Sequence, residues 1–357
     1  MHETPSPATR SAPERSGRRR PDMARRGVLS LTGLALAGTV LAGCAGGDSG
    51  AEGTAGESAP VAVATTTQLG SVLDDITSCA GATSSTVMGP GDDPHDFSPS
   101  SRQIAEMTGV DLVVTNGLGL EAGMQTALDN AAADGAHLVA VAPAVDPLPF
   151  AEHDGHEGGS HEGHSHEGGS HEGGSHEGHS HEGEDPHFWM DVSRMGEAAE
   201  LIGTELAEVT GDGQYADCGT QTAEELAAVD AEVRQILETI PEDRRTLVTD
   251  HAAYNYFAEA YALDIAGVVI PGGSTDVEPS SGELAGLVTQ MNQEGADALV
   301  TSAGSGNKLM GALSAETGGE VPVVELYEGG IGPEGSGAET YADAMVLNAR
   351  TLAEALQ

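Results

Sequence analysis

Two apolar runs, Asp111-Leu-Val-Val-Thr115 and His137-Leu-Val-Ala-Val-Ala142, enclose a stretch with the pattern of a helix over residues 121–133. Short runs of valine, leucine and alanine are typical of strands that are buried on both faces. A strand, a helix and a second strand form the unit from which parallel sheets with covering helices are built. This stretch therefore predicts an α/β fold.

The same alternation continues on both sides of this unit. Upstream, residues 61–65 and the run from Ser85 have strand character, and apolar side chains at helical spacing lie between them. Ser100 and Gln103 form the sequence pattern of a capping box at a helix start. Downstream, the expected elements are a helix that Ser193 caps, strands over 245–250, 265–270, 298–302 and 322–326, helices over 252–261, 282–293 and 308–317, and a terminal helix from Thr340.

A long amphipathic stretch separates two such groups of elements. Residues 220–240 contain neither glycine nor proline, so we expect a continuous, stiff helix of roughly 30 Å that ends at Pro241. The predicted fold is two (β/α) lobes with parallel sheets, joined by one long rigid helix, with a ligand site in the cleft between the lobes. The expected boundaries are a leader and signal peptide at 1–43, a flexible tether at 44–59, an N-terminal lobe at 60–218, a linker helix at 219–241 and a C-terminal lobe at 242–357.

The leader has the pattern of a lipoprotein signal peptide. A positive segment, Met23-Ala-Arg-Arg-Gly27, precedes an apolar segment at 28–42 that is too short to favour a membrane span. Leu41-Ala-Gly-Cys44 resembles a lipobox, which predicts cleavage before Cys44 and lipidation of that residue. We therefore expect an extracytoplasmic protein that is lipid-anchored to the outer face of the cell membrane. In that oxidising compartment, the remaining pair Cys79 and Cys218 suggests one disulfide.

The composition favours a cation as ligand. The formal net charge of −43 makes nucleic acid a poor partner and attracts metal ions. The stretch at 152–184 is built from histidine, acidic residues, serine and glycine, and it cannot contribute to a core, so we expect a disordered loop. Imidazole suits zinc, copper and nickel. The loop histidines, which we predict to bind metal weakly, are His153, His156, His161, His164, His166, His171, His176, His179 and His181.

Three histidines outside the loop share one sequence context. His95, His187 and His251 each follow an acidic residue within two positions and lie in an expected turn or strand end. Each half of the chain thus supplies a histidine to a plausible edge of the cleft. Zinc takes four ligands in tetrahedral geometry, so three imidazoles with one carboxylate or water would satisfy it. The adjacent acids would fix the tautomers of the rings.

These residues lie in motifs that resemble a known family. The segments are Asp93-Pro-His-Asp-Phe-Ser-Pro-Ser100, Asp185-Pro-His-Phe-Trp-Met-Asp191, His251-Ala-Ala-Tyr-Asn-Tyr-Phe-Ala-Glu-Ala-Tyr-Ala-Leu263, Glu278-Pro-Ser280 and Gly335-Ser-Gly-Ala-Glu-Thr-Tyr341. From about residue 61 to residue 357, the chain resembles the metal-specific substrate-binding lipoproteins of ABC importers, cluster A-I, of the zinc type.

The resemblance implies two lobes bridged by a rigid helix, with the metal in the cleft and His95, His187 and His251 as its ligands. It also implies a protein that hands Zn²⁺ to an ABC permease in the membrane, and a mobile His-rich loop. We expect a monomer. Manganese members tend to have a carboxylate where His251 stands. Three nitrogen ligands favour zinc over manganese, which prefers oxygen.

The fourth ligand departs from the family pattern, because Gly329 stands where the family often has an acid. Glu328 is the expected ligand, with Glu325 and a water molecule as alternatives.

Other functions fit the sequence less well. A zinc hydrolase would need a general base, and the chain contains neither a His-Glu-x-x-His helix nor a nucleophile elbow, so we expect no enzyme. A manganese- or iron-binding protein of the same fold and a zinc-sequestering adhesin that works without a transporter are the alternatives.

Overall fold

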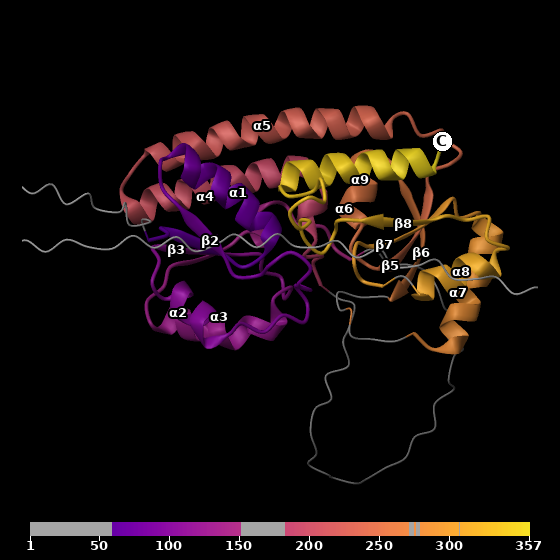
Figure 1. The fold of residues 1–357 in the computed structure, drawn as a ribbon, viewed down its shortest axis with the longest axis horizontal. Helices are drawn as coiled ribbons and strands as arrows, with labels where there is room; N and C mark the ends of the chain where they lie inside the picture. The colour runs from indigo at the N-terminus through magenta and orange to yellow at the C-terminus, as the bar shows by residue number, and fades with distance from the viewer. Residues whose placement is uncertain (1–58, 151–182, 271–274, 276–278, 307) are drawn as a thin grey trace, which may run out of the picture. The chain divides into compact units, whose positions relative to one another are not determined.

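The computed structural model describes residues 59–150, 183–270, 275, 279–306 and 308–357 (Figure 1). The expected leader, the lipidation site Cys44, the nine loop histidines and Glu278 lie outside these residues. Within the described ranges, no helix is both long enough and apolar enough to cross a membrane.

The N-terminal lobe is built on a four-stranded parallel sheet in the order β2-β1-β3-β4. Val113 of the sheet packs with Met107 and the helices on one face, whereas Leu112 packs toward the helices on the other. This alternation follows from the two-residue period of a strand, and it places α1 opposite α2 and α3 (Figure 1). The elements are β1 (Ala62–Ala64), α1 (Thr67–Cys79), β2 (Ser84–Thr86), α2 (Ser101–Met107), β3 (Leu112–Thr115), α3 (Gln125–Ala133) and β4 (Leu138–Ala140).

The C-terminal lobe repeats this plan with a parallel sheet in the order β6-β5-β7-β8. Val248 and Leu299 pack against the core under α7 and α8, and their neighbours Leu247 and Val300 join the large core on the opposite face. The elements are β5 (Thr246–His251), α6 (Asn255–Tyr261), β6 (Asp264–Ile270), α7 (Ser281–Glu294), β7 (Ala298–Ser302), α8 (Lys308–Glu316), β8 (Val323–Leu326) and α9 (Tyr341–Ala355). The predicted fold of two lobes, each with a parallel sheet, is confirmed.

The lobes are connected by η3 (Phe188–Met190), α4 (Val192–Thr210) and α5 (Gln214–Leu237). At about 1.5 Å per residue, α5 extends about 36 Å and runs beside α9 (Figure 1). It packs closely on α4 where two glycines meet: a Cβ on Gly203 would lie 2.6 Å from the carbonyl oxygen of Tyr215 and 2.8 Å from Cα of Gly219. The helix begins earlier than the expected residue 219 and ends at Leu237. A proline cannot continue a helix, because its ring clashes with the carbonyl four residues earlier, which for Pro241 is that of Leu237.

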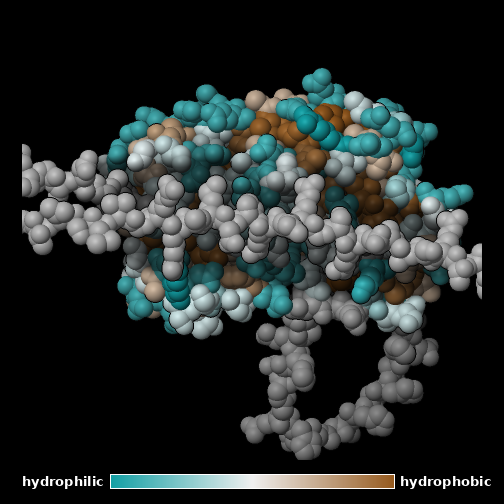
Figure 2. Space-filling model, in the orientation of Figure 1, coloured by the Kyte–Doolittle hydropathy of each residue, from teal (hydrophilic) through white to brown (hydrophobic). Residues whose placement is uncertain are grey.

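A disulfide joins Cys79, at the end of α1, to Cys218 in α5, with a Cα–Cα distance of 5.9 Å. It ties the N-terminal lobe to the connecting helix across 139 positions of sequence. Figure 2 shows hydrophilic residues around much of the outline, with patches of hydrophobic residues between them.

Local capping explains where several helices begin. Ser100 and Gln103 form the predicted capping box at the start of α2. The expectation that Ser193 caps the next long helix is wrong, because Asp191 occupies that position and accepts hydrogen bonds from the main-chain N–H and the hydroxyl of Ser193. The helix expected from residue 252 begins at Asn255, and the stretch expected to be helical from residue 121 starts with a short 3-10 turn, η1 (Ala122–Met124).

Candidate metal centre

His95 lies in the loop that follows β2 and is half-buried. Its main-chain N–H donates to Oδ1 of Asp93 at 2.9 Å, which fixes the turn formed by Asp93 and Pro94. The other oxygen of Asp93 accepts the hydroxyl of Thr275, from the C-terminal lobe, at 2.8 Å. The loop that presents His95 is therefore held from both lobes.

His187 is fully buried and precedes η3. Oδ1 of Asp185 lies 2.7 Å from its ring atom Nδ1 and also accepts its main-chain N–H at 3.0 Å. Burial raises the pKa of Asp185 to about 7 and lowers the pKa of His187 to about 3. The lowered pKa of His187 keeps the imidazole uncharged, as a metal ligand must be, and the contact at Nδ1 leaves Nε2 directed to the site.

His251 is the last residue of β5 and is buried. Its Nδ1 lies 2.8 Å from Oδ1 of Asp250, which also accepts its main-chain N–H. Burial alone would lower the pKa of His251, but the charge of Glu328 and the contact with Asp250 raise it to about 9. Asp250 is itself fixed, because its second oxygen accepts Thr301 Oγ1 at 2.6 Å and the main-chain N–H of Ser302 at 2.9 Å.

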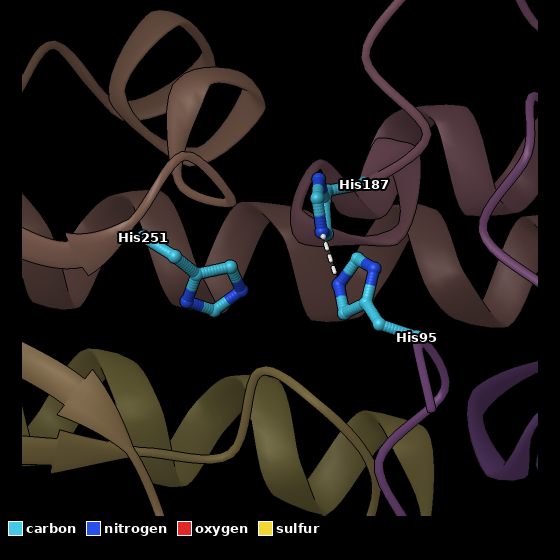
Figure 3. A group of neighbouring side chains, drawn as sticks. All are labelled: His95, His187 and His251. Carbon is cyan, nitrogen blue, oxygen red and sulfur yellow. Dashed lines mark hydrogen bonds between the residues drawn. The ribbon is translucent and has the colours of Figure 1, made fainter. Parts of the chain in front are cut away.

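The three predicted histidines converge, although they are far apart in sequence. Their ligand atoms all lie within 4.8 Å of one another, and His95 and His187 bring their Nε2 atoms to 3.2 Å (Figure 3). Two ligand atoms of a tetrahedral zinc ion lie about 3.3 Å apart if its bonds are about 2.0–2.1 Å long. The spacing of these two nitrogens is therefore close to what a bound zinc ion requires.

A buried carboxylate lies beside two of the three rings. Glu328 is 1% exposed, with Oε2 3.6 Å from Nε2 of His251 and Oε1 4.0 Å from Nε2 of His187. Glu325, the alternative, is an exposed residue within β8. His137, outside the predicted set, lies elsewhere and contacts Glu205 at 3.0 Å.

The chemistry of these atoms fits a cation. Nε2 of His251 and Oε1 of Glu328 are buried and have no hydrogen-bond partner among the described residues. Buried polar atoms are normally paired, so two such atoms on neighbouring residues of this group require an explanation. A metal ion bonded to both would satisfy them. A cavity of about 800 Å³, lined by residues of both lobes that include His95, His251 and Glu328, gives access to the group.

Further residues, which sequence reasoning missed, hold the main chain before His187. Asn116, just after β3, donates from Nδ2 to the carbonyl of Pro186 at 3.0 Å. The hydroxyl of Tyr256, from α6, donates to the carbonyl of Asp185 at 2.7 Å. Tyr256 lies within the quoted segment 251–263, but its partner is 71 positions away, so no local pattern indicates the contact.

The carboxylate of Glu121 supports Asn116 in turn. It accepts the main-chain N–H groups of Asn116 and Gly117 and the hydroxyl of Thr65. Burial raises the pKa of Glu121, and these hydrogen bonds oppose the shift.

Two α/β lobes with a ligand group between them are an arrangement that substrate-binding proteins share, and here that group suits a metal. The chain belongs to the family described as zinc-uptake complex component A, periplasmic, whose profile matches residues 62–355. It is thus a metal-binding, substrate-binding protein of an ABC transporter, which confirms the predicted resemblance.

The relatives differ in the metal that their names carry. The manganese-binding lipoprotein MntA of Halalkalibacterium halodurans is 29% identical over 321 residues, which cover 89% of this chain and 94% of the relative. The zinc-binding protein TroA of Treponema pallidum is 25% identical over 276 residues, covering 76% and 80%. The solved structure of the latter covers 83% of this chain and 99% of that chain with a TM-score of 0.65; at 24% identity it supports the fold alone.

Proposed function

We propose that this protein binds Zn²⁺ outside the cytoplasm and delivers it to an ABC permease, with His95, His187, His251 and Glu328 as the metal ligands. The observation that carries the proposal is the convergence of three imidazoles, two of which lie within 4.0 Å of one buried carboxylate. One ring nitrogen and one carboxylate oxygen of this group have no hydrogen-bond partner among the described residues. A set of three nitrogens and one oxygen suits tetrahedral zinc better than manganese, which prefers oxygen. A protein carboxylate in the fourth position also supports a transport role rather than metal-assisted hydrolysis, which needs an open position for water.

The decisive experiment is metal analysis of protein purified without chelator, followed by competition titrations with Zn²⁺ and Mn²⁺. We expect one tightly bound zinc ion per chain and its loss when His95, His187 or His251 is replaced by alanine. Wild-type zinc content in all three variants would contradict the proposed ligand set. A matched control is His137→Ala, because this histidine lies outside the group.

Manganese is the second candidate, because the relative of 29% identity is named as a manganese-binding lipoprotein. The discriminating position is His251. If the site is tuned to zinc, His251→Glu will weaken zinc binding and strengthen manganese binding, since it exchanges an imidazole for an oxygen ligand. A wild-type protein that already prefers manganese in competition would favour this alternative.

We further propose that lipidation of Cys44 holds a monomeric protein at the outer face of the membrane. The support is the signal pattern in residues 23–44 and the lipoprotein names of relatives. Cys44→Ser should release the protein from the membrane fraction without changing its zinc affinity. Retention of the variant in the membrane would refute the anchor.

The His-rich loop is proposed to collect zinc and pass it to the high-affinity site. Its composition and its position just before His187 support this role. Deleting residues 153–183 should leave one tight site and remove several weak ones in a calorimetric titration. An unchanged number of weak sites would reject the role.

A further inference from the structure

The main chain of Glu328 is held by residues outside its own lobe. Glu328 follows β8 of the C-terminal sheet, yet its carbonyl oxygen accepts hydrogen bonds from one side chain of the N-terminal lobe and one of the segment that connects the lobes. These are Nε2 of Gln68, in the first turn of α1, at 3.0 Å, and Nε1 of Trp189, in η3, at 2.9 Å. Both donors are buried, with exposed fractions of 3% and 2%.

The segment after Glu328 is attached to the same elements. The main-chain N–H of Ile331 donates to Oγ1 of Thr67 at 3.0 Å, and that of Tyr341 donates to Oγ of Ser71 at 3.0 Å. The hydroxyl of Tyr341 donates to the carbonyl of Trp189 at 2.7 Å. The loop between β8 and α9 is therefore fixed to α1 and η3 at both of its ends.

The carboxylate of Glu328 extends from this fixed main chain toward the histidines. From the C-terminal sheet, the hydroxyl of Ser302 donates to Oε2 at 2.5 Å. Oε1 lies 4.0 Å from Nε2 of His187, a residue directly before the η3 turn that carries Trp189. Trp189 also lies beside the His187 ring, with centroids 5.2 Å apart and the ring planes inclined at 59°. The indole of Trp189 thus contacts the proposed ligand His187 through its ring and holds the main chain of the proposed ligand Glu328 through its N–H.

We propose that Gln68 and Trp189 are positioning residues that hold Glu328 in the frame of the N-terminal lobe. His95, His187 and Glu328 then form one unit, and His251 is the ligand that the C-terminal lobe brings to it. This inference rests on the proposed function, because it takes Glu328 as a metal ligand. A metal–oxygen bond is about 2.0–2.2 Å long, so a shift of 1 Å in the main chain would remove the carboxylate from the metal.

The test removes one donor and keeps the side-chain length. Gln68→Met should weaken zinc binding about tenfold, as is typical for loss of a residue that orients a ligand, and it should alter the visible absorption of the Co²⁺-loaded protein. The matched control is Gln290→Met, because Gln290 also donates to a main-chain carbonyl, that of Ala266, but does so beneath the other sheet. The control should keep wild-type zinc affinity and the wild-type cobalt spectrum.

A double-mutant cycle with Glu328→Ala separates positioning from general destabilisation. If Gln68 acts through the carboxylate, Gln68→Met will cause no further loss of zinc affinity in the Glu328→Ala background. Equal losses in both backgrounds, or wild-type affinity in Gln68→Met, would overturn the inference. If Gln68→Met does not fold, Trp189→Phe removes the second donor, keeps an aromatic ring beside His187, and is subject to the same cycle.

Failure of the proposed function gives a different result. Zinc binding that survives alanine at His95, His187 and His251 would reject the metal site as a whole. Zinc binding that depends on the three histidines but is indifferent to Gln68 and Trp189 would reject only the positioning role.

Discussion

Nδ1 of His251 lies 2.8 Å from Oδ1 of Asp250, its neighbour in sequence, at the carboxyl end of β5. Adjacent residues of a strand normally point to opposite faces, and here the contact forms at the last residue of the strand. The second oxygen of Asp250 accepts Thr301 Oγ1 and the main-chain N–H of Ser302 at the end of β7. Asp250 therefore connects the orientation of one proposed ligand to the neighbouring strand.

Replacing Asp250 by asparagine should weaken zinc binding by about 10- to 100-fold, a typical cost when a residue that orients a ligating histidine is lost. The amide has one acceptor oxygen, so it cannot serve both His251 and the donors from β7. Chelator-competition titration measures the effect. Asp297→Asn is the matched control, because Asp297 accepts the main-chain N–H of Thr246 at the opposite end of β5. Equal zinc affinity in the two variants would contradict the role of Asp250.

Zinc affinity should rise with pH up to about 9. The pKa of His251 in the metal-free protein is raised to about 9, because Glu328 and Asp250 outweigh the opposing effect of burial. At pH 7 this ring carries a proton that the metal must displace, so each zinc ion should release about one proton and affinity should change about tenfold per pH unit. The attraction between the protonated ring of His251 and the carboxylates of Glu328 and Asp250 also stabilises the metal-free fold. This stabilisation is fully present below the ordinary histidine pKa of about 6.5 and is lost as pH rises through 9.

Calorimetry in buffers with different ionisation enthalpies measures this proton release. Glu328→Gln removes the charge that contributes most to the raised pKa of His251, so release at pH 7.5 should fall in this variant. His187 should contribute nothing, since burial holds its pKa at about 3. Proton release that is unchanged in Glu328→Gln would show that the displaced proton belongs to another group.

The sequence predicts the elements well where the signal is local. The apolar run before Thr115 and the capping pair Ser100 and Gln103 depend on neighbouring residues alone, and both elements form as predicted. The three histidines could also be selected, because each stands beside an acid at an expected turn or strand end. The resemblance to a metal-binding family, drawn from those motifs, is confirmed by the profile match.

Contacts between distant segments could not be predicted in this way. Asn116 and Tyr256 act on main-chain carbonyls about 70 positions away, and nothing near them in sequence indicates the partner. The choice between Glu325 and Glu328 could have been made from the sequence, because it depends only on where strand β8 ends. Glu325 is exposed and lies within β8, whereas Glu328 is buried and follows the end of the strand, which is where ligands bind in parallel sheets.

The disulfide between Cys79 and Cys218 should stabilise the fold without affecting the metal site. It closes a loop of 139 positions, for which chain entropy predicts a loss of about 3–5 kcal/mol of unfolding free energy when it is absent. Thermal unfolding of the metal-free Cys79→Ser, Cys218→Ser double variant should occur at lower temperature, and zinc affinity at 25 °C should be unchanged. Reductant should lower the melting temperature of the wild type and leave that of the variant alone. A wild type indifferent to reductant under unfolding conditions would contradict the bond.

The contact between α4 and α5 should tolerate no side chain at Gly203. A Cβ there would lie 2.6 Å from the carbonyl oxygen of Tyr215, which is main chain and cannot rotate away. Gly203→Ala should therefore force the helices apart and lower the unfolding free energy by about 1–3 kcal/mol, as overpacking typically does. Gly196→Ala in the same helix is the control, since a Cβ at this position would come no closer than 3.8 Å to Ala223. This substitution should raise the unfolding free energy, because a glycine within a helix costs about 0.5–1 kcal/mol relative to alanine. Urea unfolding should therefore give a lower unfolding free energy for Gly203→Ala and a higher one for Gly196→Ala than for the wild type. Equal unfolding free energies of the two variants would mean that the helices can separate at no cost.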